Sequence, residues 1–515
     1  MTSTATDPPT EPAPGVVRAA ARRLGRLDAT MIVIGSMIGS GIFITSAESS
    51  RLVGAPGWLL AAWLLSGLMT VCGAISAAEI ASMMPRVGGQ YVFLRETYGR
   101  PVGFLFGWSN FMVVQTGTIA AVAVAFSKFL GVFAPWVSDK NYVLAPLHLA
   151  TTGYGLSVTT QQMTALLLIA GLTWTNTRGL DIGAWIQNTF TAAKTAALIG
   201  LIVVGCVLGR RPDAAAWASS WWDGAANGWT AAGAQSGLPS WGVLALAMLL
   251  GKAMIGPLFS QSAWNNVTFT SGETRDPERT LPFAMITGSA IVVALYVLAN
   301  IAYATTLSFD EIQHAPADRV GTALMLKTLG PYGASAMAAA ILISTFGCVN
   351  GLILAGARVS YAMARDGLFF APAARLNSRA VPAFALLAQG FWACLLTLPV
   401  TVAADAVAGS FKYGNLYNQL LEYIIPADLS FYCLMVGATL ILRVRRPDLP
   451  RPFRAWLFPL PALIYIGLAG LLILDFVVLA PATSGIGCAL VLAGVPVYWA
   501  WSRFGGRSGA SVADR

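Results

Sequence analysis

Charged residues are scarce in this chain. Asp, Glu, Lys and Arg make up 11% of its 515 residues, whereas hydrophobic residues make up 56% and the mean hydropathy is +0.66. A soluble domain carries about 25% charged residues. Most of the chain must therefore face lipid or other apolar helices, which excludes a soluble globular fold.

Histidine and cysteine are also rare. The two histidines, His148 and His314, fall in predicted loops, so the predicted spans carry no His–carboxylate cluster for a metal. All six cysteines fall within predicted spans, without metal-type spacing, and are expected to act as packing residues. We expect no metal or other cofactor, and a membrane-embedded enzyme is disfavoured. A channel or sensor is disfavoured as well, because rings of like charge and a carbonyl filter are missing from the sequence.

Twelve apolar stretches are long enough to cross a membrane as helices. An outer-membrane barrel would instead show short segments of alternating polarity. Residues 1–26 are expected to be a disordered, basic cytoplasmic N-terminus and residues 504–515 a cytoplasmic tail. The predicted spans are residues 29–51, 58–84, 102–131, 160–176, 183–208, 240–271, 283–307, 335–364, 381–400, 418–442, 456–480 and 484–502.

The basic residues predict the orientation of the chain. Most of the 32 Lys and Arg residues fall on the same side as the N-terminus, the pattern expected of cytoplasmic loops. Both ends are therefore predicted to be cytoplasmic, in a plasma or inner membrane. The net charge of +9 follows from this bias and requires no nucleic-acid partner.

A lysine lies in the middle of the fifth predicted span. If this span begins near Gly183, Lys194 lies about 16 Å along it at 1.5 Å per residue, close to the middle of a bilayer of about 30 Å. An ammonium at that depth costs several kcal/mol unless it is paired, hydrated or bonded to carbonyls. The alternatives are a tolerated, snorkelling side chain and a buried cation that braces or switches a transporter.

The first predicted span carries two glycines around a serine at its centre. Gly39-Ser40-Gly41 is a poor helix centre, because each glycine costs about 1 kcal/mol relative to alanine. Close helix packing through the GxxxG pattern of Gly35 and Gly39 is the alternative. Unwinding would leave a half-helix N-terminus, which binds a carboxylate.

The sixth predicted span contains a matching interruption. Gly256-Pro257 is followed by Ser260, Gln261 and Ser262, a combination expected to break a helix and free carbonyls for an ammonium. The two interruptions open two five-helix halves, residues 27–210 and 236–443, and residues 455–503 add two helices. Interruptions at corresponding positions indicate a substrate site in an inverted-repeat transporter.

Several short motifs lie along the chain. They are Gly35 to Phe43, Gly88 to Tyr91, Phe190 to Lys194, Phe259 to Trp264, Glu273 to Pro282, Tyr296 to Ser308, Ser344 to Gly351 with Arg358, Arg365-Asp-Gly367, and Arg446 to Pro452. Their combination, over about residues 24–500, resembles the amino acid–polyamine–organocation transporters, and among them the L-type amino-acid exchangers and their bacterial relatives. The resemblance implies an all-α, LeuT-like fold with a five-plus-five inverted repeat, broken helices 1 and 6 and two C-terminal helices.

The resemblance implies roles for particular residues. The unwound part of helix 1 would hold the substrate carboxylate, and that of helix 6 would hold the substrate ammonium. Lys194 would stand where sodium-coupled relatives hold an ion, bridging helix 1 carbonyls near Ser36 and Met37 to Ser344. Phe259 would close over the substrate as a gate. The substrate-binding residues expected from this are Ile38, Gly39, Ser40, Gly41, Phe259, Ser260, Ser262 and Asn350.

The side-chain pocket is less closely specified. Ser344 and Asn350 are about 120° apart on a helix, so one of the two is expected on the substrate. Gln115, with Thr116 and Thr118, would line the pocket or pack between helices. Gln261 and Asp428 are further pocket candidates. Asp428 is an acid within a predicted span, and it would contact a cationic side chain, pair with Lys252 or lie hydrated near the outer end.

The function implied is sodium-independent exchange of L-amino acids, most of all neutral ones, by alternating access. The alternatives are a proton-coupled symporter and a carrier of cationic amino acids or polyamines. The animal relatives bond to a glycoprotein through a cysteine between helices 3 and 4. Residues 132–159 contain no cysteine, so the expected partners are the amino acid and the lipid bilayer, without a disulfide-linked heavy chain.

Overall fold

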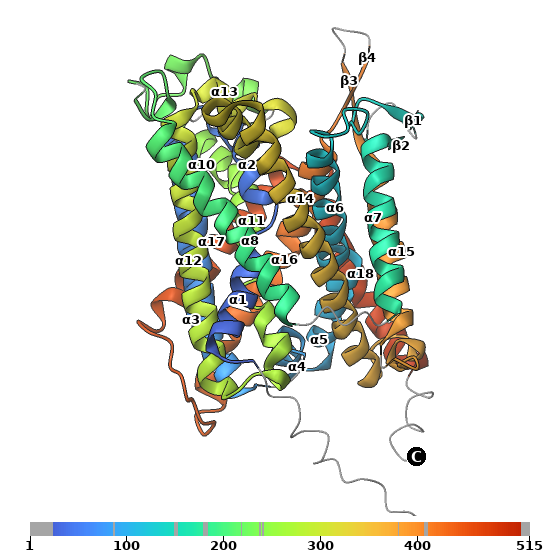
Figure 1. The fold of residues 1–515 in the computed structure, drawn as a ribbon. Coiled ribbons are helices and arrows are strands. Elements are labelled where there is room, and N and C mark those ends of the chain that lie inside the picture. Colours follow the sequence, from blue (N-terminus) through green and yellow to red (C-terminus); the bar gives the residue numbers. More distant parts are fainter. Residues whose placement is uncertain are drawn as a thin grey trace, which may run out of the picture.

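The computed structural model describes residues 24–85, 88–148, 153–178, 184–217, 219–235, 238, 242–379, 381–405 and 410–505. The expected disordered N-terminus lies outside these residues up to position 23, and the expected tail lies outside them from position 506. The described chain is predominantly helical, as predicted, and its helices form one bundle (Figure 1).

The helices follow the predicted spans closely. They are α1 (Arg26–Met37), α2 (Gly41–Val53), α3 (Pro56–Met83), α4 (Gln90–Tyr98), α5 (Arg100–Ser109), α6 (Gln115–Leu130), α7 (Thr160–Thr177), α8 (Ala184–Val203), α9 (Ala231–Ala234), α10 (Gly242–Ala253), α11 (Ile255–Ser260), α12 (Pro277–Thr306), α13 (Phe309–Gln313), α14 (Val320–Arg365), α15 (Ala383–Leu396), α16 (Leu416–Arg445), α17 (Leu460–Leu479) and α18 (Ser484–Ala500). Short 3₁₀ or π turns are η1 (Asn110–Val114), η2 (Val204–Leu208), η3 (Ala215–Trp217), η4 (Ala225–Asn227), η5 (Asn266–Glu273), η6 (Pro316–Asp318), η7 (Ala371–Ala374) and η8 (Trp501–Gly505).

Nine helices of the described chain are long and apolar enough to cross a membrane, or ten when α1 and α2 count as one span. The other two predicted stretches are helical too: α7 has 18 residues, and α15 is a shorter apolar helix of 14. The structure therefore confirms a helical membrane protein, while the count of twelve spans and the five-plus-five repeat stay predictions.

A small antiparallel sheet corrects the all-α expectation. Strands β1 (Tyr142–His148), β2 (Gly153–Thr159), β3 (Pro399–Asp405) and β4 (Ser410–Tyr413) pair in the order β1-β2-β3-β4. The sheet lies beyond the upper ends of α6, α7 and α15 in Figure 1. Its β2–β3 pairing joins segments about 245 residues apart, and local sequence patterns do not specify pairing over such a separation.

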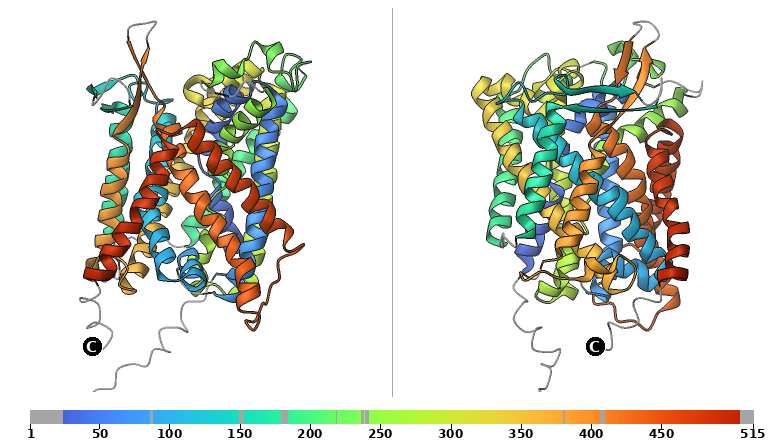
Figure 2. Two further views of the ribbon diagram at one scale, coloured as in Figure 1. Left: turned by 180° about the vertical axis from the view of Figure 1, so that it is seen from behind. Right: turned by 90° about the vertical axis from the view of Figure 1, so that its right-hand side faces the viewer.

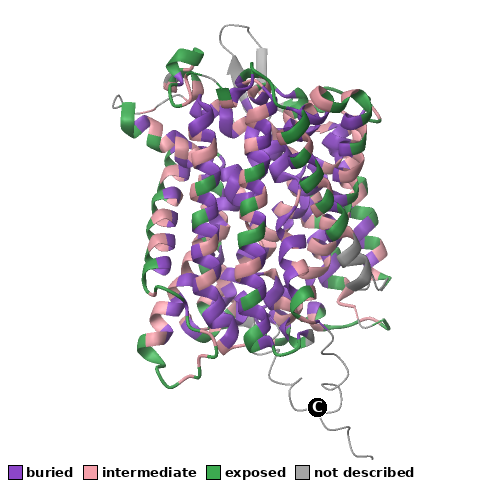
Figure 3. Ribbon diagram, turned by 60° about the vertical axis from the view of Figure 1, so that its left-hand side comes forward, coloured by how far each residue is buried: buried purple, intermediate pink, exposed green. Residues whose placement is uncertain are grey.

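Small residues bring the central helices into close contact. A Cβ atom added at Gly67 of α3 would lie 2.5 Å from Val293 of α12, and one at Gly288 of α12 would lie 2.7 Å from Val33 of α1. Close approach of this kind is typical of helices packed within membranes. Buried residues fill the interior, and exposed ones gather on the outer helix faces (Figure 3). Helix α18 lies at this periphery, because only 17% of its most apolar stretch is buried within the protein.

The first and last described segments lie on the same face of the bundle. Leu24 pairs with Thr274 at the end of η5, and the Trp501 indole donates to the Gly367 carbonyl beyond α14. Figure 2 shows both segments at the end opposite the sheet. We call this the lower face, and the face with the sheet and α13 the upper face.

A buried carboxylate ties three segments together near the lower face. Glu79 of α3 is 0% exposed and accepts bonds from Arg443 of α16 at 2.6 and 2.9 Å and from the Ala455 N–H at 2.8 Å. The Arg451 guanidinium lies 3.4 Å away. One acid therefore balances two arginines where α3, α16 and the α16–α17 connection meet.

Replacing this carboxylate should destabilise the fold. Glu79→Gln leaves two arginines without their counter-charge, and breaking a buried pair costs about 3–5 kcal/mol, less where one partner is partly exposed. We expect the melting temperature of the purified protein to fall by several degrees in thermal-shift measurements. Glu96→Gln, which removes an exposed carboxylate paired with Arg95 at 2.8 Å, serves as the control and should change it little. Equal melting temperatures for both variants would contradict this role of Glu79.

Candidate functional site

The first predicted span is interrupted where its glycines predict. Helix α1 ends at Met37, α2 begins at Gly41, and the two axes differ by 42°. Ile38 has an extended backbone, with φ −72° and ψ 96°, so the residues between the helices leave their carbonyl and N–H groups outside the helical ladder.

Side chains from two other helices satisfy carbonyls around this break. The Lys194 ammonium of α8 donates to the Gly35 carbonyl, and Lys194 is 5% exposed. The Tyr296 hydroxyl of α12 donates to the Met37 carbonyl at 2.9 Å. At the second residue of α2, the Tyr303 hydroxyl donates to the Ile42 carbonyl at 3.1 Å. The expected bond from Lys194 to helix 1 is therefore present, one residue before the carbonyls near Ser36 and Met37.

Sequence reasoning missed the two tyrosines as site residues. Both are 0% exposed, and their seven-residue spacing places them on one face of α12. Two hydroxyls buried in a span need hydrogen-bond partners, and an interrupted helix supplies carbonyls. That pairing of donors with freed acceptors was the available signal.

The two glycines of the break have different surroundings. A Cβ at Gly39 would meet no heavy atom within 4 Å, so free space lies beside this residue. A Cβ at Gly41 would lie 2.0 Å from the Ser260 Oγ of α11. Gly41 therefore serves a close contact between α2 and α11, and Gly39 is the glycine that a ligand can approach.

The sixth span is interrupted twice. Helix α10 ends at Ala253, one turn before Pro257, which has no N–H for the Ala253 carbonyl; the Ser49 hydroxyl donates to that carbonyl at 2.8 Å instead. Helix α11 begins at Ile255 and ends at Ser260, and η5 begins at Asn266. Ala263, between them, has φ +67°, a conformation that L-residues rarely adopt.

The predicted ammonium-binding residues lie at this helix end. Phe259 and Ser260 close α11, and Ser262 lies beyond it. The Phe259 carbonyl accepts the Ser262 N–H at 3.2 Å and the Ser262 hydroxyl at 2.8 Å. The carbonyls of Phe259 and Ser260 thus lie at the C-terminal end of α11, which carries the negative end of the helix dipole.

An aromatic pair covers the upper side of the first break. Phe259 packs edge-on against Tyr417 of α16, with ring centroids 6.3 Å apart. The Tyr417 hydroxyl lies 3.3 Å from the Ser40 Oγ. Phe259 therefore lies where a gate over the break would lie, and Tyr417 is a second aromatic that the sequence did not single out.

A cluster of charges lies above this aromatic pair. The Lys128 ammonium of α6 lies 5.6 Å from the Tyr417 ring and 3.4 Å from the Asp318 carboxylate. Asp318 also pairs with Arg51 of α2 at 3.0 Å and accepts a bond from Asn415 at 2.8 Å. We call Arg51, Lys128 and Asp318 the upper ion cluster.

The acid of this cluster is held in an unusual environment. Burial alone would raise the pKa of Asp318, but the nearby Lys128 and Arg51 outweigh it and lower the pKa below its ordinary value. Ala317 and Asp318 both have positive φ angles, 54° and 61°. Such strain occurs at switch regions and persists only where the surrounding structure enforces it.

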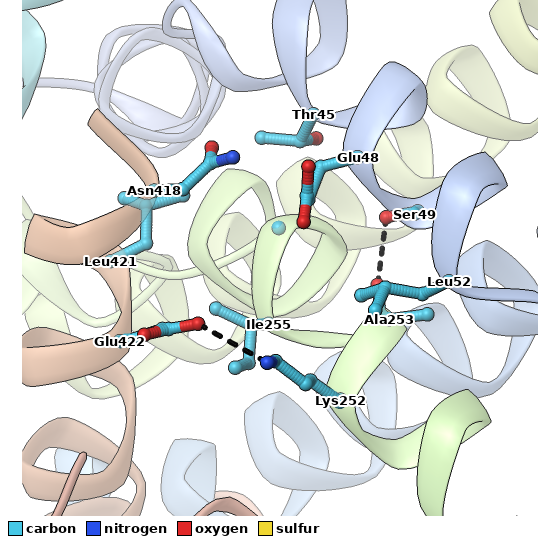
Figure 4. Close-up of a pocket in the computed structure, with 11 residues that line it drawn as sticks. Thr45, Glu48, Ser49, Leu52, Lys252, Ala253, Ile255, Asn418, Leu421 and Glu422 are labelled. Atoms are coloured by element: carbon cyan, nitrogen blue, oxygen red, sulfur yellow. Dashed lines mark hydrogen bonds and ion pairs between the residues drawn. The ribbon is translucent and has the colours of Figure 1, made fainter. Parts of the chain in front are cut away.

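A small cavity opens between α2, α10, α11 and α16 (Figure 4). It holds about 30 Å³. The Lys252 ammonium lies 3.7 Å from the Glu422 carboxylate and donates to Gln235 at 2.8 Å. Of the three alternatives for Asp428, pairing with Lys252 is therefore not the one found. Glu422, six residues earlier on α16, is the acid at the level of Lys252.

Two of the predicted pocket residues instead join neighbouring helices. The Asn350 side chain of α14 accepts a bond from Asn176 of α7 at 2.7 Å. Gln115 of α6 donates to the Leu352 carbonyl of α14 at 2.7 Å. Thr116 and Thr118 each bond to a carbonyl of their own helix segment. Ser344 is buried, and its hydroxyl has no partner among the described residues, so it is the freer of the two α14 candidates. The expected bridge from Lys194 to Ser344 is therefore not formed.

The remaining two candidates lie beside the sixth-span break. Gln261 is 0% exposed, accepts a bond from Thr70 at 3.3 Å and donates to the Trp63 carbonyl at 3.3 Å. Asp428 faces a cavity of about 20 Å³ together with Gln261, Ser262 and Tyr432. Asp428 makes no hydrogen bond or ion pair with the described residues. A carboxylate at that depth therefore requires water, a proton or a cation.

Comparisons with known proteins identify the family. A family model described as amino acid permease matches residues 24–499. The mouse large neutral amino acids transporter small subunit 2 is 31% identical over 480 residues, which cover 93% of this chain and 80% of the relative. The mouse Asc-type amino acid transporter 1 is 30% identical over 486 residues, which cover 93% of this chain and 81% of the relative.

A bacterial relative extends the same picture. The serine/threonine exchanger SteT of Bacillus subtilis (strain 168) is 27% identical over 480 residues, which cover 93% of this chain and 96% of the relative. These relatives point to a transporter of amino acids rather than an enzyme, and the apolar helices place it in a membrane as a multi-pass protein. The chain belongs to the amino acid permease family, within the amino acid–polyamine–organocation superfamily.

Proposed function

We propose that this protein is a sodium-independent exchanger of L-amino acids that works by alternating access. The observation that carries the proposal is the bond from the buried Lys194 ammonium to the Gly35 carbonyl at the first break. A fixed ammonium supplies the positive charge that sodium supplies in coupled relatives, and a second cation beside it would be repelled.

The two helix breaks provide complementary ends for a zwitterion. The first turn of α2 begins at Gly41 and offers N–H groups at the positive end of a helix dipole, beside the free space at Gly39. The end of α11 offers the Ser260 carbonyl at the negative end of its dipole, whereas the Phe259 carbonyl already accepts two bonds from Ser262. The α-carboxylate would bind the first site and the α-ammonium the second.

Neutral side chains fit this site best. Gln261 and Ser262 add uncharged polar groups beyond α11, and three relatives are by name transporters of large neutral amino acids, an Asc-type carrier and a serine/threonine exchanger. The second candidate is a cationic amino acid or polyamine, which the unpaired Asp428 favours.

We also propose the arrangement of the chain in the membrane. Residues 27–210 and 236–443 would form the two inverted repeats, with the lower face and both termini in the cytoplasm and the plasma or inner membrane as the location. The mouse relative is by name a small subunit. Residues 132–159 contain no cysteine, so this chain would work without a disulfide-linked heavy chain.

Exchange follows from the way the empty carrier is held. Lys194 joins α8 to α1, and the upper ion cluster joins α2, α6 and the segment before α14. The change from one carrier state to the other must break some of these contacts. A bound substrate offsets that cost if it binds the intermediate in this change more tightly than the starting state. The loaded carrier would therefore return faster than the empty one.

Countertransport in sodium-free medium tests the proposal. Proteoliposomes loaded with unlabelled amino acid should take up labelled amino acid several-fold faster than empty ones, and replacing sodium by choline should leave that rate unchanged. Equal rates with and without internal amino acid would indicate a uniporter. Steep sodium dependence, or stimulation by an inward proton gradient alone, would indicate a symporter.

Gly39 tests the placement of the carboxylate. Gly39→Val should fold, because the space beside it is free, and should lower saturable uptake by about tenfold or more through lost hydrogen bonds to a charged group. Gly171→Val in α7, where a Cβ also meets nothing within 4 Å, is the matched control and should transport normally. An unchanged KM and maximal rate in Gly39→Val would refute this placement.

A competition panel decides the substrate class. Unlabelled leucine, alanine and serine should inhibit uptake of a labelled neutral substrate at lower concentrations than arginine, lysine or a polyamine. Asp428→Asn should leave this order unchanged, because the carboxylate is not expected to contact the substrate. If the cationic compounds compete best and Asp428→Asn removes their advantage, the second candidate is correct.

A further inference from the structure

An open cavity of about 530 Å³ lies at the lower face, between α4, η5 and α14. Its walls come from these three elements, and η5 is the segment that directly follows the sixth-span break. The lining residues are Tyr91, Val92, Arg95, Phe269, Gly272, Arg358, Tyr361, Ala362, Arg365 and Asp366.

The cavity carries an excess of positive charge. Its acid, Asp366, is engaged by the Arg95 guanidinium and by the Tyr91 hydroxyl at 2.7 Å. Arg358 and Arg365 have no ion pair or hydrogen bond recorded in the described part of the chain. Two guanidinium groups, with five N–H donors each, therefore face the cavity without an acceptor.

The general bias of basic residues toward the cytoplasm accounts for one of these arginines only. Arg365 is the last residue of α14, whereas Arg358 lies two turns earlier, about 10 Å deeper at 1.5 Å per residue. Its neighbours Ala357 and Val359 are 1% and 3% exposed, whereas Arg358 itself is exposed. A charge at that depth must face water, and the cavity provides it.

The position of Arg358 on α14 relates the cavity to the central site. Ser344, the buried hydroxyl without a partner, lies 14 residues earlier, within about 40° of the same helix face. One side of α14 thus runs from the lower cavity toward the surroundings of the first break.

We propose that Arg358 and Arg365 form a binding site for the α-carboxylate of an amino acid that enters from the lower face. A guanidinium binds a carboxylate through two parallel hydrogen bonds, and a cleft lined by one sign of charge raises the local concentration of the opposite sign. The inference rests on the proposed exchange function. It assigns to the cavity the capture of the counter-substrate on one side of the membrane.

The site should affect one side of transport only. We would measure exchange in proteoliposomes of determined orientation and vary the amino acid first on the lower-face side and then on the opposite side. Arg358→Gln together with Arg365→Gln should raise the KM on the lower-face side about three- to tenfold, leaving the opposite KM and the rate at saturation near wild type. Arg358→Lys together with Arg365→Lys keeps both charges but not the paired hydrogen bonds, and should give a KM between those of the wild type and the Gln variant.

Two controls separate this site from a general loss of positive charge. Arg375→Gln removes an exposed arginine outside the cavity lining and should leave both KM values unchanged. Raising the salt concentration on the lower-face side should raise the wild-type KM toward that of the double variant, because salt screens exposed charges.

The outcomes are distinguishable. An unchanged lower-face KM in the double variant, with normal wild-type exchange, would overturn this inference alone. A lowered rate at saturation that depends on the fraction of anionic lipid would assign the arginines to a lipid headgroup and would overturn it as well. A wild type that does not exchange at all would refute the proposed function instead.

Discussion

The bonds that hold the first helix break determine which parts of this protein can move. Lys194 fixes the lower half-helix α1 to α8, and Tyr296 fixes its last carbonyl to α12. Tyr303 and the Gly41–Ser260 contact fix the upper half-helix α2 to α12 and α11. The two half-helices therefore pack in different neighbourhoods, with only a few residues between them, and α12 contacts both.

This arrangement explains why a costly lysine is kept at the centre of a membrane protein. A buried carbonyl or ammonium without a hydrogen-bond partner costs several kcal/mol in that environment. The bond between Lys194 and the Gly35 carbonyl gives each group its partner and so removes both costs. Replacing Lys194 by an apolar residue would leave the Gly35 carbonyl without this donor. The break and the lysine consequently depend on each other, which a continuous α1–α2 helix would not require.

The sequence allowed parts of the fold and site to be predicted for identifiable reasons. Helical spans follow from hydropathy, and the first break follows from the helix cost of Gly39 and Gly41. These two conclusions rest on local composition. The depth of Lys194 indicated only that its ammonium needs a partner, water or carbonyls, and the family resemblance implied that helix 1 supplies the carbonyls.

The predictions that went wrong depended on contacts between distant segments. Pairing of β2 with β3 joins loops whose own sequences do not specify a partner. The sequence also left the partner of Lys252 open. It is Glu422 because the relative heights and rotations of α10 and α16 decide which acid lies opposite, and hydropathy reports neither.

The charged groups near the upper face are paired, whereas those in the cavity at the lower face are not. Above the first break, Tyr417 and Phe259 lie beneath Lys128, Asp318 and Arg51, whose charges are mutually paired. Below, Arg358 and Arg365 remain unpaired in an open cavity. The upper side is therefore closed by contacts that must be broken, whereas the lower side offers unsatisfied donors to a ligand. In the proposed exchange, this difference would favour the state that is open toward the lower face. An amino acid bound between the two breaks would then have to supply the difference in affinity that opens the upper side.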